Sequence, residues 1–512
     1  MLKKIYASAL FGVEASTITV EVNVCKGIGY HLVGLPDNAI KESNYRIAAA
    51  LLNNGFKIPG KKVTINLAPA DVRKEGSAYD LPIAMGILAA SKQIESEGIE
   101  DFVIMGELSL DGNLQSIKGV LPIALNALKS GFKAIIVPIQ NVEEAAIVEG
   151  ITVYGVNNIS QVIGFFDKSK PLIPYTNDKK NIFGSHFNQF DFDFSDVKGQ
   201  LGVKRCMEIA AAGGHNIILI GPPGSGKSML AKRLSTIMPP MTMEESIETT
   251  KIHSIQGNIS GSGIITKRPF RNPHHTISDV ALVGGGQYPQ PGEISLAHNG
   301  VLFLDELPEF KRSVLEVMRQ PLEDREVTIS RAKFNITYPS SFMLVASMNP
   351  SPSGYFNNDE APVKSTPYEM QRYLSKISGP LLDRIDIHIE VNPVPFEKLA
   401  SKDSAESSST IRSRVIRART IQTQRFENHD GIHYNAQMQS SHIKKYCMLS
   451  EASFSLLEHA MEQLNLSARA YDRILKLSRT IADLEHEKDV KPHHISEAIQ
   501  YRSLDRQAWL AP

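Results

Sequence analysis

The sequence predicts a multidomain protein of the α/β class that ends in a helical domain. Residues 1–166 alternate β-patterned apolar runs with helix-patterned runs, and residues 197–394 repeat this alternation. Residues 395–512 are mainly helix-patterned, interrupted by a serine-rich stretch at 401–409. A chain of 512 residues exceeds what one hydrophobic core usually supports, so about three or four globular units are expected.

The composition is typical of a globular protein with an aqueous surface. Hydrophobic residues make up 42% of the chain and charged residues 21%. No apolar run approaches the roughly 18 residues that cross a bilayer, so no membrane partner is expected. The start of the chain predicts a first strand and not a signal peptide, because Glu14 interrupts its apolar patch and an alternating run follows.

The cysteine content indicates the expected cellular compartment, and the charge content limits the expected binding partners. Cys25, Cys206 and Cys447 are too scattered for a disulfide framework or a zinc quartet, so a reducing cytoplasm is the expected location. Acidic and basic residues balance at 55 each. This balance argues against a uniformly basic protein, and any nucleic-acid-binding surface must therefore be local.

The N-terminal α/β domain is expected to span residues 1–166. Its clearest β-patterned runs are 17–24, 62–67 and 134–137, and its clearest helical runs are 39–53, 81–90 and 120–130. Residues 167–196 are polar and contain Pro171 and Pro174, a composition that predicts a linker to the second α/β domain.

A phosphate-binding loop is predicted at the start of the second domain. A short apolar strand at 216–220 and a helical run at 229–237 flank a G-x-x-x-x-G-K-S sequence. The loop consists of Gly221, Pro222, Pro223, Gly224, Ser225, Gly226, Lys227 and Ser228. Its glycines allow backbone N–H groups to face phosphate oxygens, Lys227 neutralises the outer phosphates, and Ser228 is a Mg²⁺ ligand. ATP and Mg²⁺ are the expected cofactors.

Two adjacent acids end a buried strand further along the chain. Residues 301–304 are wholly apolar and lead into Asp305 and Glu306, where the carboxyl ends of parallel strands meet a ligand. Asp305 is predicted to hold Mg²⁺ and Glu306 to orient and deprotonate the attacking water. An apolar strand that ends in acids usually marks only a solvated turn, and the loop at 221–228 makes the catalytic interpretation the better one.

Three further polar residues complete the predicted catalytic set. Asn349 follows a third apolar strand and could position the water, although an isolated Asn-Pro is most often a turn. Arg384 could reach the γ-phosphate of a neighbouring subunit, or form a salt bridge with Asp383 or Asp386. Arg469 begins a helix and could sense the γ-phosphate in its own subunit, or simply lie on the helix surface.

Long motifs around these residues resemble a known family. Residues 268–278 (RPFRNPHHTIS), 291–307 and 378–386 (SGPLLDRID) resemble the magnesium-chelatase-type AAA+ ATPases. From about Tyr6 to Arg502, the chain is similar to the ComM/YifB branch of this group. The resemblance implies a P-loop AAA+ αβα core at 197–394, a helical lid at 395–512 and a nucleotide-dependent hexamer. It also implies DNA branch migration during natural transformation. In the ATPase site, the resemblance implies that Asn349 is the first sensor residue, Arg384 the arginine finger and Arg469 the second sensor residue.

The first domain resembles the proteolytic domain of Lon, an α/β fold of the S5 type. The similarity lies in residues 74–80 (KEGSAYD) and 106–119. Lon-type cleavage needs a lysine base beside its serine, but the helix expected to carry that lysine begins VLPIA at 120–124. Ser77 remains a possible nucleophile without an evident base. A non-proteolytic scaffold is therefore expected.

One departure from the family pattern concerns zinc. Relatives often have Cys-Pro-Cys-Gly after the Asn-Pro, whereas this chain has Ser351, Pro352, Ser353 and Gly354. Because the thiolate ligands are absent, no zinc is expected there.

Two basic segments are candidates for DNA contact. Residues 249–278 contain no acid, and the proposed contacts are Lys251, Lys267, Arg268, Phe270 and Arg271. This segment could instead be a solvated loop or pack against a neighbouring subunit. The arginines at 412, 414, 417, 419 and 425 fall on several faces of a helical run, so the pattern fits a simple exposed helix at least as well as a DNA contact.

Three functions are compatible with these observations. The leading hypothesis is a hexameric ATPase that translocates on DNA and migrates branches during recombination. The alternative is a chelatase-like motor that remodels a protein or inserts a metal into a tetrapyrrole. A static nucleotide switch is disfavoured because Glu306, the predicted base, is present.

Overall fold

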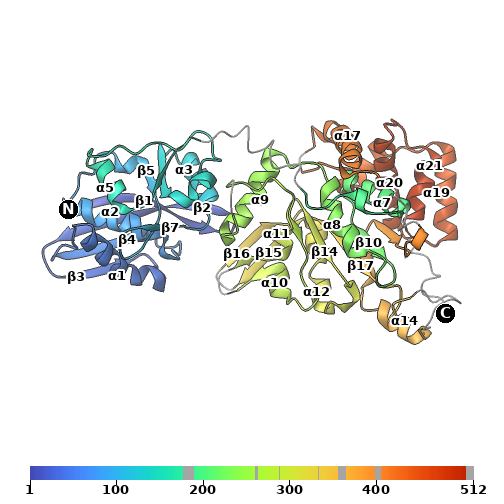
Figure 1. The fold of residues 1–512 in the computed structure, drawn as a ribbon, viewed down its shortest axis with the longest axis horizontal. Helices are drawn as coiled ribbons and strands as arrows, with labels where there is room; N and C mark the ends of the chain where they lie inside the picture. Colours follow the sequence, from blue (N-terminus) through green and yellow to red (C-terminus); the bar gives the residue numbers. More distant parts are fainter. Residues whose placement is uncertain are drawn as a thin grey trace. The chain divides into compact units, whose positions relative to one another are not determined.

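The computed structural model describes residues 1–176, 190–259, 263–286, 289–331, 334–355, 365–397, 405–429 and 431–502. The chain divides into two compact units, which Figure 1 shows coloured along the sequence. Unit 1 comprises Met1–Phe187 and Thr242–Thr266, and unit 2 comprises Asn188–Met241 and Lys267–Pro512. Each unit is therefore built from two separate stretches of chain.

Unit 1 is built on a seven-stranded mixed sheet in the order β3-β4-β2-β1-β5-β8-β9. The strands are β1 (Leu2–Phe11), β2 (Glu14–Cys25), β3 (Gly29–Val33), β4 (Lys62–Ala68), β5 (Phe102–Ile104), β8 (Ala134–Pro138) and β9 (Thr152–Val156). The β1–β2 and β2–β4 pairs are antiparallel, and the other pairs are parallel. Alternation decides the faces of β2, since Ile18, Val20 and Val22 are fully buried between more exposed residues.

Helices complete unit 1. They are α1 (Asn38–Asn53), α2 (Asp80–Ala90), α3 (Val120–Lys129), α4 (Val142–Ala145), α5 (Ile159–Phe166) and α9 (Met243–Gln256), with the short hairpin β6 (Glu107–Leu108) and β7 (Leu114–Gln115). Every residue of α2 is buried, because the helix packs against β1 and β2. The predicted α/β class is confirmed, and each β-patterned and helical run expected in residues 1–166 overlaps a strand or helix of the matching type.

Unit 2 is built on a five-stranded parallel sheet in the order β11-β14-β17-β10-β18. The strands are β10 (Ile217–Ile220), β11 (Phe270–Arg271), β14 (Val301–Leu304), β17 (Met343–Met348) and β18 (Ile387–Glu390). All residues of β10, β14 and β17 are buried, as expected for parallel strands covered on both faces. The carboxyl ends of these three central strands consequently lie at one edge of the sheet.

Helices and two hairpins surround this sheet. The helices are α7 (Leu201–Gly213), α8 (Lys227–Ile237), α10 (Asp279–Val283), α11 (Glu293–Leu296), α12 (Arg312–Glu316), α13 (Arg319–Asp324), α14 (Pro367–Leu374) and α15 (Gly379–Leu382). The hairpins pair β12 (Gly284–Gly285) with β13 (Gln290–Pro291) and β15 (Glu326–Arg331) with β16 (Phe334–Pro339).

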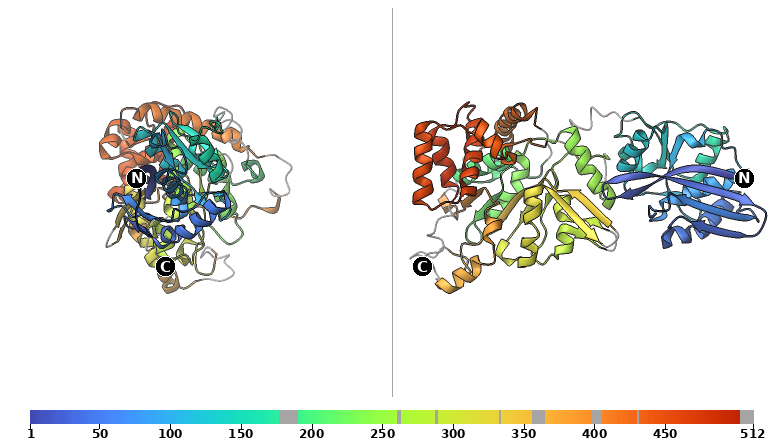
Figure 2. Two further views of the ribbon diagram at one scale, coloured as in Figure 1. Left: turned by 90° about the vertical axis from the view of Figure 1, so that its left-hand side faces the viewer. Right: turned by 180° about the vertical axis from the view of Figure 1, so that it is seen from behind.

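The C-terminal helices belong to the same unit as the parallel sheet. They are α17 (Ser408–Phe426), α18 (Ser440–Tyr446), α19 (Glu451–Gln463), α20 (Ala468–Leu484) and α21 (Pro492–Gln500). Figure 2 shows α19, α20 and α21 grouped together, and α17 packs on α7, α8 and α20. Apolar residues of these helices and of the sheet form one hydrophobic core. The expected core and lid are therefore parts of one compact unit.

The arginines of α17 mostly hold this helix in place. Arg414 pairs with Glu208 and Glu406, and Arg425 pairs with the buried Asp483. Arg419 donates to the carbonyl oxygen of Ala211 at 2.9 Å. These contacts favour a structural role for this helix over a DNA contact.

The predicted linker at 167–196 is ordered at both described ends. Residues 177–189 of this range lie outside the described residues. On the N-terminal side, the N–H of Tyr175 donates to the carbonyl of Val153 in unit 1 at 2.8 Å. On the C-terminal side, Phe194 is fully buried in the core of unit 2.

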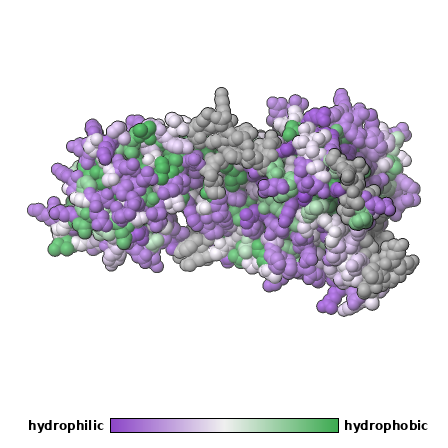
Figure 3. Space-filling view, in the orientation of Figure 1, coloured by the Kyte–Doolittle hydropathy of each residue, from purple (hydrophilic) through white to green (hydrophobic). Residues whose placement is uncertain are grey.

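The surface agrees with the composition. Figure 3 shows hydrophilic residues over most of this face of each unit, with hydrophobic residues scattered among them. Among the described residues, no helix combines the length and the apolar character needed to span a bilayer.

Candidate nucleotide-binding site

The loop between β10 and α8 is shaped by glycines. Gly224 and Gly226 have φ angles of +79° and +91°, values in the left-handed region that favours glycine. A Cβ atom on Gly221 would lie 2.2 Å from the carbonyl oxygen of Val391, closer than two such atoms can approach. Residues 221–228 therefore turn tightly into the N-terminus of α8, the setting in which backbone N–H groups bind phosphate.

A buried hydroxyl in this loop has no partner in the structure. The Oγ of Ser225 is buried and makes no hydrogen bond to any described residue. Buried polar groups are nearly always satisfied, so the orphaned hydroxyl is what a loop built to receive phosphate oxygens would contain.

Lys227 is held at the centre of the site. Its Nζ donates to the carbonyl oxygens of Gly221 and Pro222 at 2.6 and 3.0 Å and to the Oδ1 of Asn349 at 3.2 Å. Burial lowers the pKa of the Lys227 amine, and the nearby carboxylates of Asp305 and Glu306 oppose this effect. The amine therefore links the loop to the tip of β17.

Asp305 joins the other two strand ends. One carboxylate oxygen accepts a hydrogen bond from the Oγ of Ser228 at 2.7 Å, and the other accepts a hydrogen bond from the Oγ of Ser347. The parallel pairing of β14 with β17 brings Asp305 and Ser347 together, because Leu304 lies opposite Ala346 and each of these residues is followed directly by one of the pair. A hydroxyl and a carboxylate oxygen at this spacing are hard donors of the kind that Mg²⁺ prefers, so the predicted pair of ligands fits this ion.

Glu306 has an unusual backbone conformation. Its backbone has a φ of +55°, in the left-handed region, and its N–H donates to the Oγ of Ser347 at 3.1 Å. Such a conformation is uncommon for a residue with a side chain and recurs at functional sites. Glu306 is exposed, so a solvent molecule can reach its carboxylate.

Asn349 is fixed at its backbone as well as at its side chain. Its carbonyl oxygen accepts a hydrogen bond from the hydroxyl of Tyr373 on α14 at 3.1 Å. Because β17 ends at Met348, directly before this residue, strand and helix together position the amide. The structure therefore brings these predicted residues together through two direct hydrogen bonds, one from Lys227 to Asn349 and one from Ser228 to Asp305.

The two predicted arginines lie together, away from these bonds. Arg384 pairs with Glu323 of α13 and donates to the carbonyl oxygen of Pro380 at 2.7 Å. Arg469 pairs with Asp383, the residue before Arg384, at 2.9 Å. Within the described residues, no hydrogen bond links either arginine to residues 221–228.

The partner of Arg384 differs from both partners considered in the sequence. Asp383 binds Arg469, and Asp386 is buried between Arg473 and the Nδ1 of His215. Glu323 lies 61 residues before Arg384, so no local spacing could indicate the pair. Ser347 and Tyr373 were also missed, since isolated hydroxyl residues carry no motif.

The five predicted DNA-contacting residues are divided between the units. Lys251 lies on α9 in unit 1, where it is half-buried, and the other four belong to unit 2. Arg271 forms a two-bond pair with Glu293, with both distances 2.7 Å. Phe270 packs against Phe303 of the sheet, with ring centroids 6.0 Å apart.

Arg268 and Lys267 also have partners in unit 2. The guanidinium of Arg268 donates to the carbonyl oxygens of Pro239, Pro240 and Asn299 at 2.7, 3.1 and 2.7 Å. Lys267 is exposed and lies 5.6 Å from the ring centroid of Phe190. Arg268, Phe270 and Arg271 thus stabilise the fold of unit 2, which weakens the case that they contact DNA directly.

The Lon-like motif in unit 1 has no serine–lysine hydrogen bond in the described residues. The hydroxyl of Ser77 donates to the carboxylate of Glu107, and the amine of the fully buried Lys74 donates to the carbonyl oxygen of Pro69. A hydroxyl paired with a carboxylate lacks the amine base that this chemistry needs. The contacts favour the prediction of a non-proteolytic domain.

A side-chain cluster in unit 2 superficially resembles a metal site. Glu485, His493 and His494 place three possible ligand atoms within 4.8 Å of one another. However, the Nδ1 of His494 accepts a hydrogen bond from the backbone N–H of Lys491 at 2.9 Å, so Nε2 carries the proton and faces Glu485 at 3.1 Å. A protonated nitrogen cannot coordinate a metal, and His494 instead caps the N-terminus of α21.

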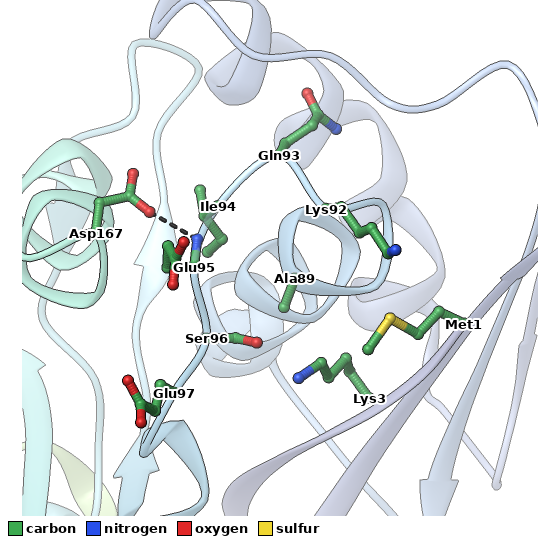
Figure 4. Close-up of a pocket in the computed structure, with 10 residues that line it drawn as sticks. All are labelled: Met1, Lys3, Ala89, Lys92, Gln93, Ile94, Glu95, Ser96, Glu97 and Asp167. Atoms are coloured by element: carbon green, nitrogen blue, oxygen red, sulfur yellow. Dashed lines mark hydrogen bonds between the residues drawn. The ribbon is translucent and has the colours of Figure 1, made fainter.

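A surface cavity of about 690 Å³ lies in unit 1. Figure 4 shows the amines of Lys3 and Lys92 on one side and the carboxylate of Asp167 on the other, where it accepts a hydrogen bond from the N–H of Glu95 at 2.7 Å. Its mixture of amines and carboxylates matches no one class of ligand.

Three stretches of the chain match family models of one group. Residues 193–399 match the family model described as magnesium chelatase, subunit ChlI. Residues 20–141 match the model for subunit ChlI of Mg-chelatase, and residues 405–502 match the model for the ChlI C-terminal region.

Individual relatives extend this similarity to nearly the whole chain. Competence protein ComM of Haemophilus influenzae is 44% identical over 504 residues, which cover 98% of this chain and 97% of the relative. The uncharacterized protein YifB of Escherichia coli is 43% identical over 508 residues, with 99% and 98% covered. An archaeal Lon protease of Methanocaldococcus jannaschii is 26% identical over 175 residues, covering 31% of this chain and 26% of the relative. The chain therefore belongs to the ComM/YifB family of magnesium-chelatase-like AAA+ proteins.

Proposed function

We propose that this protein is an ATP hydrolase that acts as a ring-forming motor on DNA. The observation that carries the hydrolase proposal is a pair of hydrogen bonds at the ends of three parallel strands, from Lys227 to Asn349 and from Ser228 to Asp305. Such a set can bind a nucleotide triphosphate and act on its terminal phosphate. The family adds support, since residues 193–399 match the magnesium chelatase subunit ChlI model and a competence protein is 44% identical over nearly the whole chain.

Each residue has a separable task in this proposal. Lys227 and the N–H groups of residues 221–228 bind the phosphates, and Ser228 and Asp305 hold Mg²⁺. Bound Mg²⁺ would neutralise charge on the phosphate oxygens. Glu306 orients a water molecule and accepts its proton as the water attacks the γ-phosphorus, while the amide of Asn349 fixes the position of that water.

We propose that the motor is a cytoplasmic hexamer in which Arg384 reaches the nucleotide of a neighbouring subunit. Arg384 has no bond to the loop of its own subunit among the described residues, and Arg469 lies beside it through Asp383. A guanidinium that arrives with a neighbour stabilises charge in the transition state only when the ring is assembled.

The substitution Arg384→Ala is expected to lower kcat for ATP by about 10³-fold while leaving nucleotide binding close to wild type, because the finger acts mainly on the transition state. Steady-state hydrolysis and binding of a fluorescent ATP analogue provide the two measurements. Arg372→Ala, at an exposed arginine of α14, is the matched control. Wild-type turnover by Arg384→Ala, in protein shown to be assembled, would exclude the finger role.

DNA is the proposed substrate of the motor. The support is the similarity to a protein named for competence and the implication of the family that branched DNA is processed. The alternative, a chelatase-like motor on a protein or tetrapyrrole, is supported by the family models.

Stimulation of hydrolysis distinguishes these substrates. With ATP and Mg²⁺, a four-way DNA junction is expected to raise the hydrolysis rate several-fold more than single-stranded or linear double-stranded DNA, because a branch-migrating motor engages the junction. The assay compares initial rates at matched nucleotide concentrations and moderate salt, since contacts to phosphate weaken as salt rises. Stimulation by a porphyrin or a protein but by none of the three DNA forms would favour the chelatase-like motor.

A further inference from the structure

Residues 242–266, here named the bridging segment, belong to a different unit from the chain on either side of them. They follow α8 and precede β11, both in unit 2, yet they pack as part of unit 1. The sequence-based division placed this segment inside the ATPase core at 197–394. The bridging segment begins with α9, whose N-terminus is closed by a capping box between Thr242 and Glu245.

The C-terminal end of α9 is bonded to the N-terminus of α3. The carbonyl oxygen of Ser254 accepts a hydrogen bond from the N–H of Gly119 at 3.1 Å, and its hydroxyl donates to the buried carboxylate of Glu144. The same carboxylate accepts the N–H of Leu121 at 2.8 Å. Burial raises the pKa of the Glu144 carboxyl, and the hydrogen bonds from Ser254 and Leu121 oppose this effect. A buried acceptor shared in this way fixes the position of α9 on α3.

Further described residues of the bridging segment also pack against unit 1. Ile264 belongs to the hydrophobic core of unit 1, and Ile247 packs against that core. A Cβ atom on Gly263 would lie within 2.7 Å of three backbone atoms of Glu143 and Glu144, and this glycine has a φ of +71°. Any larger residue at 263 must therefore displace the segment from α4.

In unit 2, the chain entering the bridging segment and the chain leaving it are tied together. Arg268 follows the segment and donates to the carbonyl oxygens of Pro239 and Pro240, which precede it. It also donates to the carbonyl of Asn299 beside β14. The chain before the bridging segment and the chain after it are therefore held together by Arg268, which also bonds to Asn299 next to β14.

The entering chain starts at the nucleotide site. Lys227 is the first residue of α8, the helix ends at Ile237, and only residues 238–241 separate it from the bridging segment. Two of those four residues are prolines, which fix φ and limit flexibility. The connection from α8 to the bridging segment is therefore short and has restricted backbone freedom.

We propose that the bridging segment couples the nucleotide site of unit 2 to α3 of unit 1, so that unit 1 senses the nucleotide. The inference rests on the proposed function in one respect, that residues 221–228 bind ATP. Phosphate oxygens would replace the carbonyl oxygens of Gly221 and Pro222 as partners of the Lys227 amine. This replacement is the differential contact that such coupling needs, and it occurs at the first turn of α8.

Hydrogen exchange of the α3 N-terminus tests the coupling. The full chain with Glu306→Gln retains ATP without turnover, and ATP with Mg²⁺ is expected to change the exchange rate in a peptide covering residues 117–125 by about fivefold or more. That peptide contains the N–H groups of Gly119 and Leu121, which bond to the bridging segment and to Glu144. Adding Lys227→Ala to this protein is expected to abolish the response.

Two variants locate the coupling in the bridging segment. Gly263→Ala, which pushes the segment from α4, is expected to reduce the response at least about threefold, since packing against α4 carries it. Gly55→Ala is the matched control, because Gly55 also has a positive φ, +83°, but a Cβ there meets nothing within 4 Å. Ser254→Ala removes only the hydroxyl donor to Glu144 and is expected to act in the same direction as Gly263→Ala, so the test survives if the latter fails to fold.

The outcomes separate this inference from the proposed function. Nucleotide binding with an unchanged exchange rate at 117–125 would overturn the coupling and leave the ATPase proposal intact. A full response in both Gly263→Ala and Ser254→Ala would also overturn it, since the signal would then pass elsewhere. Absence of nucleotide binding by wild-type protein would remove the ATPase proposal and the coupling with it.

Discussion

Glu306→Gln is expected to reduce ATP hydrolysis by at least about 10²-fold while ATP binding stays close to wild type. The amide keeps the size of the side chain but cannot accept the proton of the attacking water, and general-base catalysis typically contributes about 10² to 10⁴. The main-chain bond from Glu306 to Ser347 does not involve the side chain, so the site should keep its shape. Phosphate release measures turnover, and equilibrium binding of a fluorescent ATP analogue measures affinity.

The control for this substitution is Glu309→Gln. Glu309 lies three residues further along the chain, and its carboxylate pairs at 3.3 Å with Lys376 on the surface. Loss of such an exposed pair should have little effect. Hydrolysis by Glu306→Gln at the rate of Glu309→Gln would show that another group is the base.

Lys227→Ala is expected to weaken ATP binding by about 10²-fold and to prevent any ATP-dependent ring assembly. The amine is the charged donor at the centre of the site, where it reaches Gly221, Pro222 and Asn349. A charged hydrogen bond contributes about 1.5–3 kcal/mol, and the upper value corresponds to roughly a hundredfold change in Kd. Binding titration with the fluorescent analogue and sedimentation with and without ATP are the two measurements.

An exposed lysine on the same helix supplies the comparison. Lys232 lies five residues further along α8 and is exposed, so Lys232→Ala should bind ATP as the wild type does. Equal affinities of Lys227→Ala and Lys232→Ala would mean that the nucleotide binds elsewhere.

The candidate nucleotide site could be predicted from the sequence because its residues are either contiguous or lie at the ends of apolar strands. Residues 221–228 are contiguous, and their turn depends only on the conformational freedom of glycine and the strand and helix on either side. Asp305 and Asn349 are distant in sequence, but both end apolar strands. Since parallel strands present their carboxyl ends at one edge, meeting Lys227 and Ser228 was the expected result, and the hydrogen bonds confirm that they meet.

The less successful inferences concerned partners that no periodicity specifies. Arg268 and Arg271 stand in a stretch without acids, which suggested a free basic surface, but their partners are backbone carbonyls and Glu293 from other segments. Glu323 was not considered for Arg384 for the same reason. A sequence gives the order of charges along the chain, whereas the fold decides which of them meet.

The sequence also could not predict the unit to which α9 belongs. The helical pattern of α9 is a local property of the sequence. The unit against which α9 packs depends instead on groups from other parts of the chain, such as the N–H of Gly119 and the carboxylate of Glu144, which form hydrogen bonds with Ser254. Position in the chain suggested unit 2, because the segment is flanked on both sides by strands and helices of that unit. The close packing of Gly263 against residues 143 and 144 shows that this segment fits unit 1 specifically.

The interleaving of the two units also bears on how the protein is made. A ribosome completes β10 and α8 of unit 2 before it adds Ile247 and Ile264, which pack in or against the core of unit 1. Domains usually fold in order as they emerge, but here the N-terminal one stays unfinished until roughly half of the polypeptide has been translated. Its folding is thus tied in time to that of the ATPase sheet, and a chaperone that shields nascent chains would meet both at once.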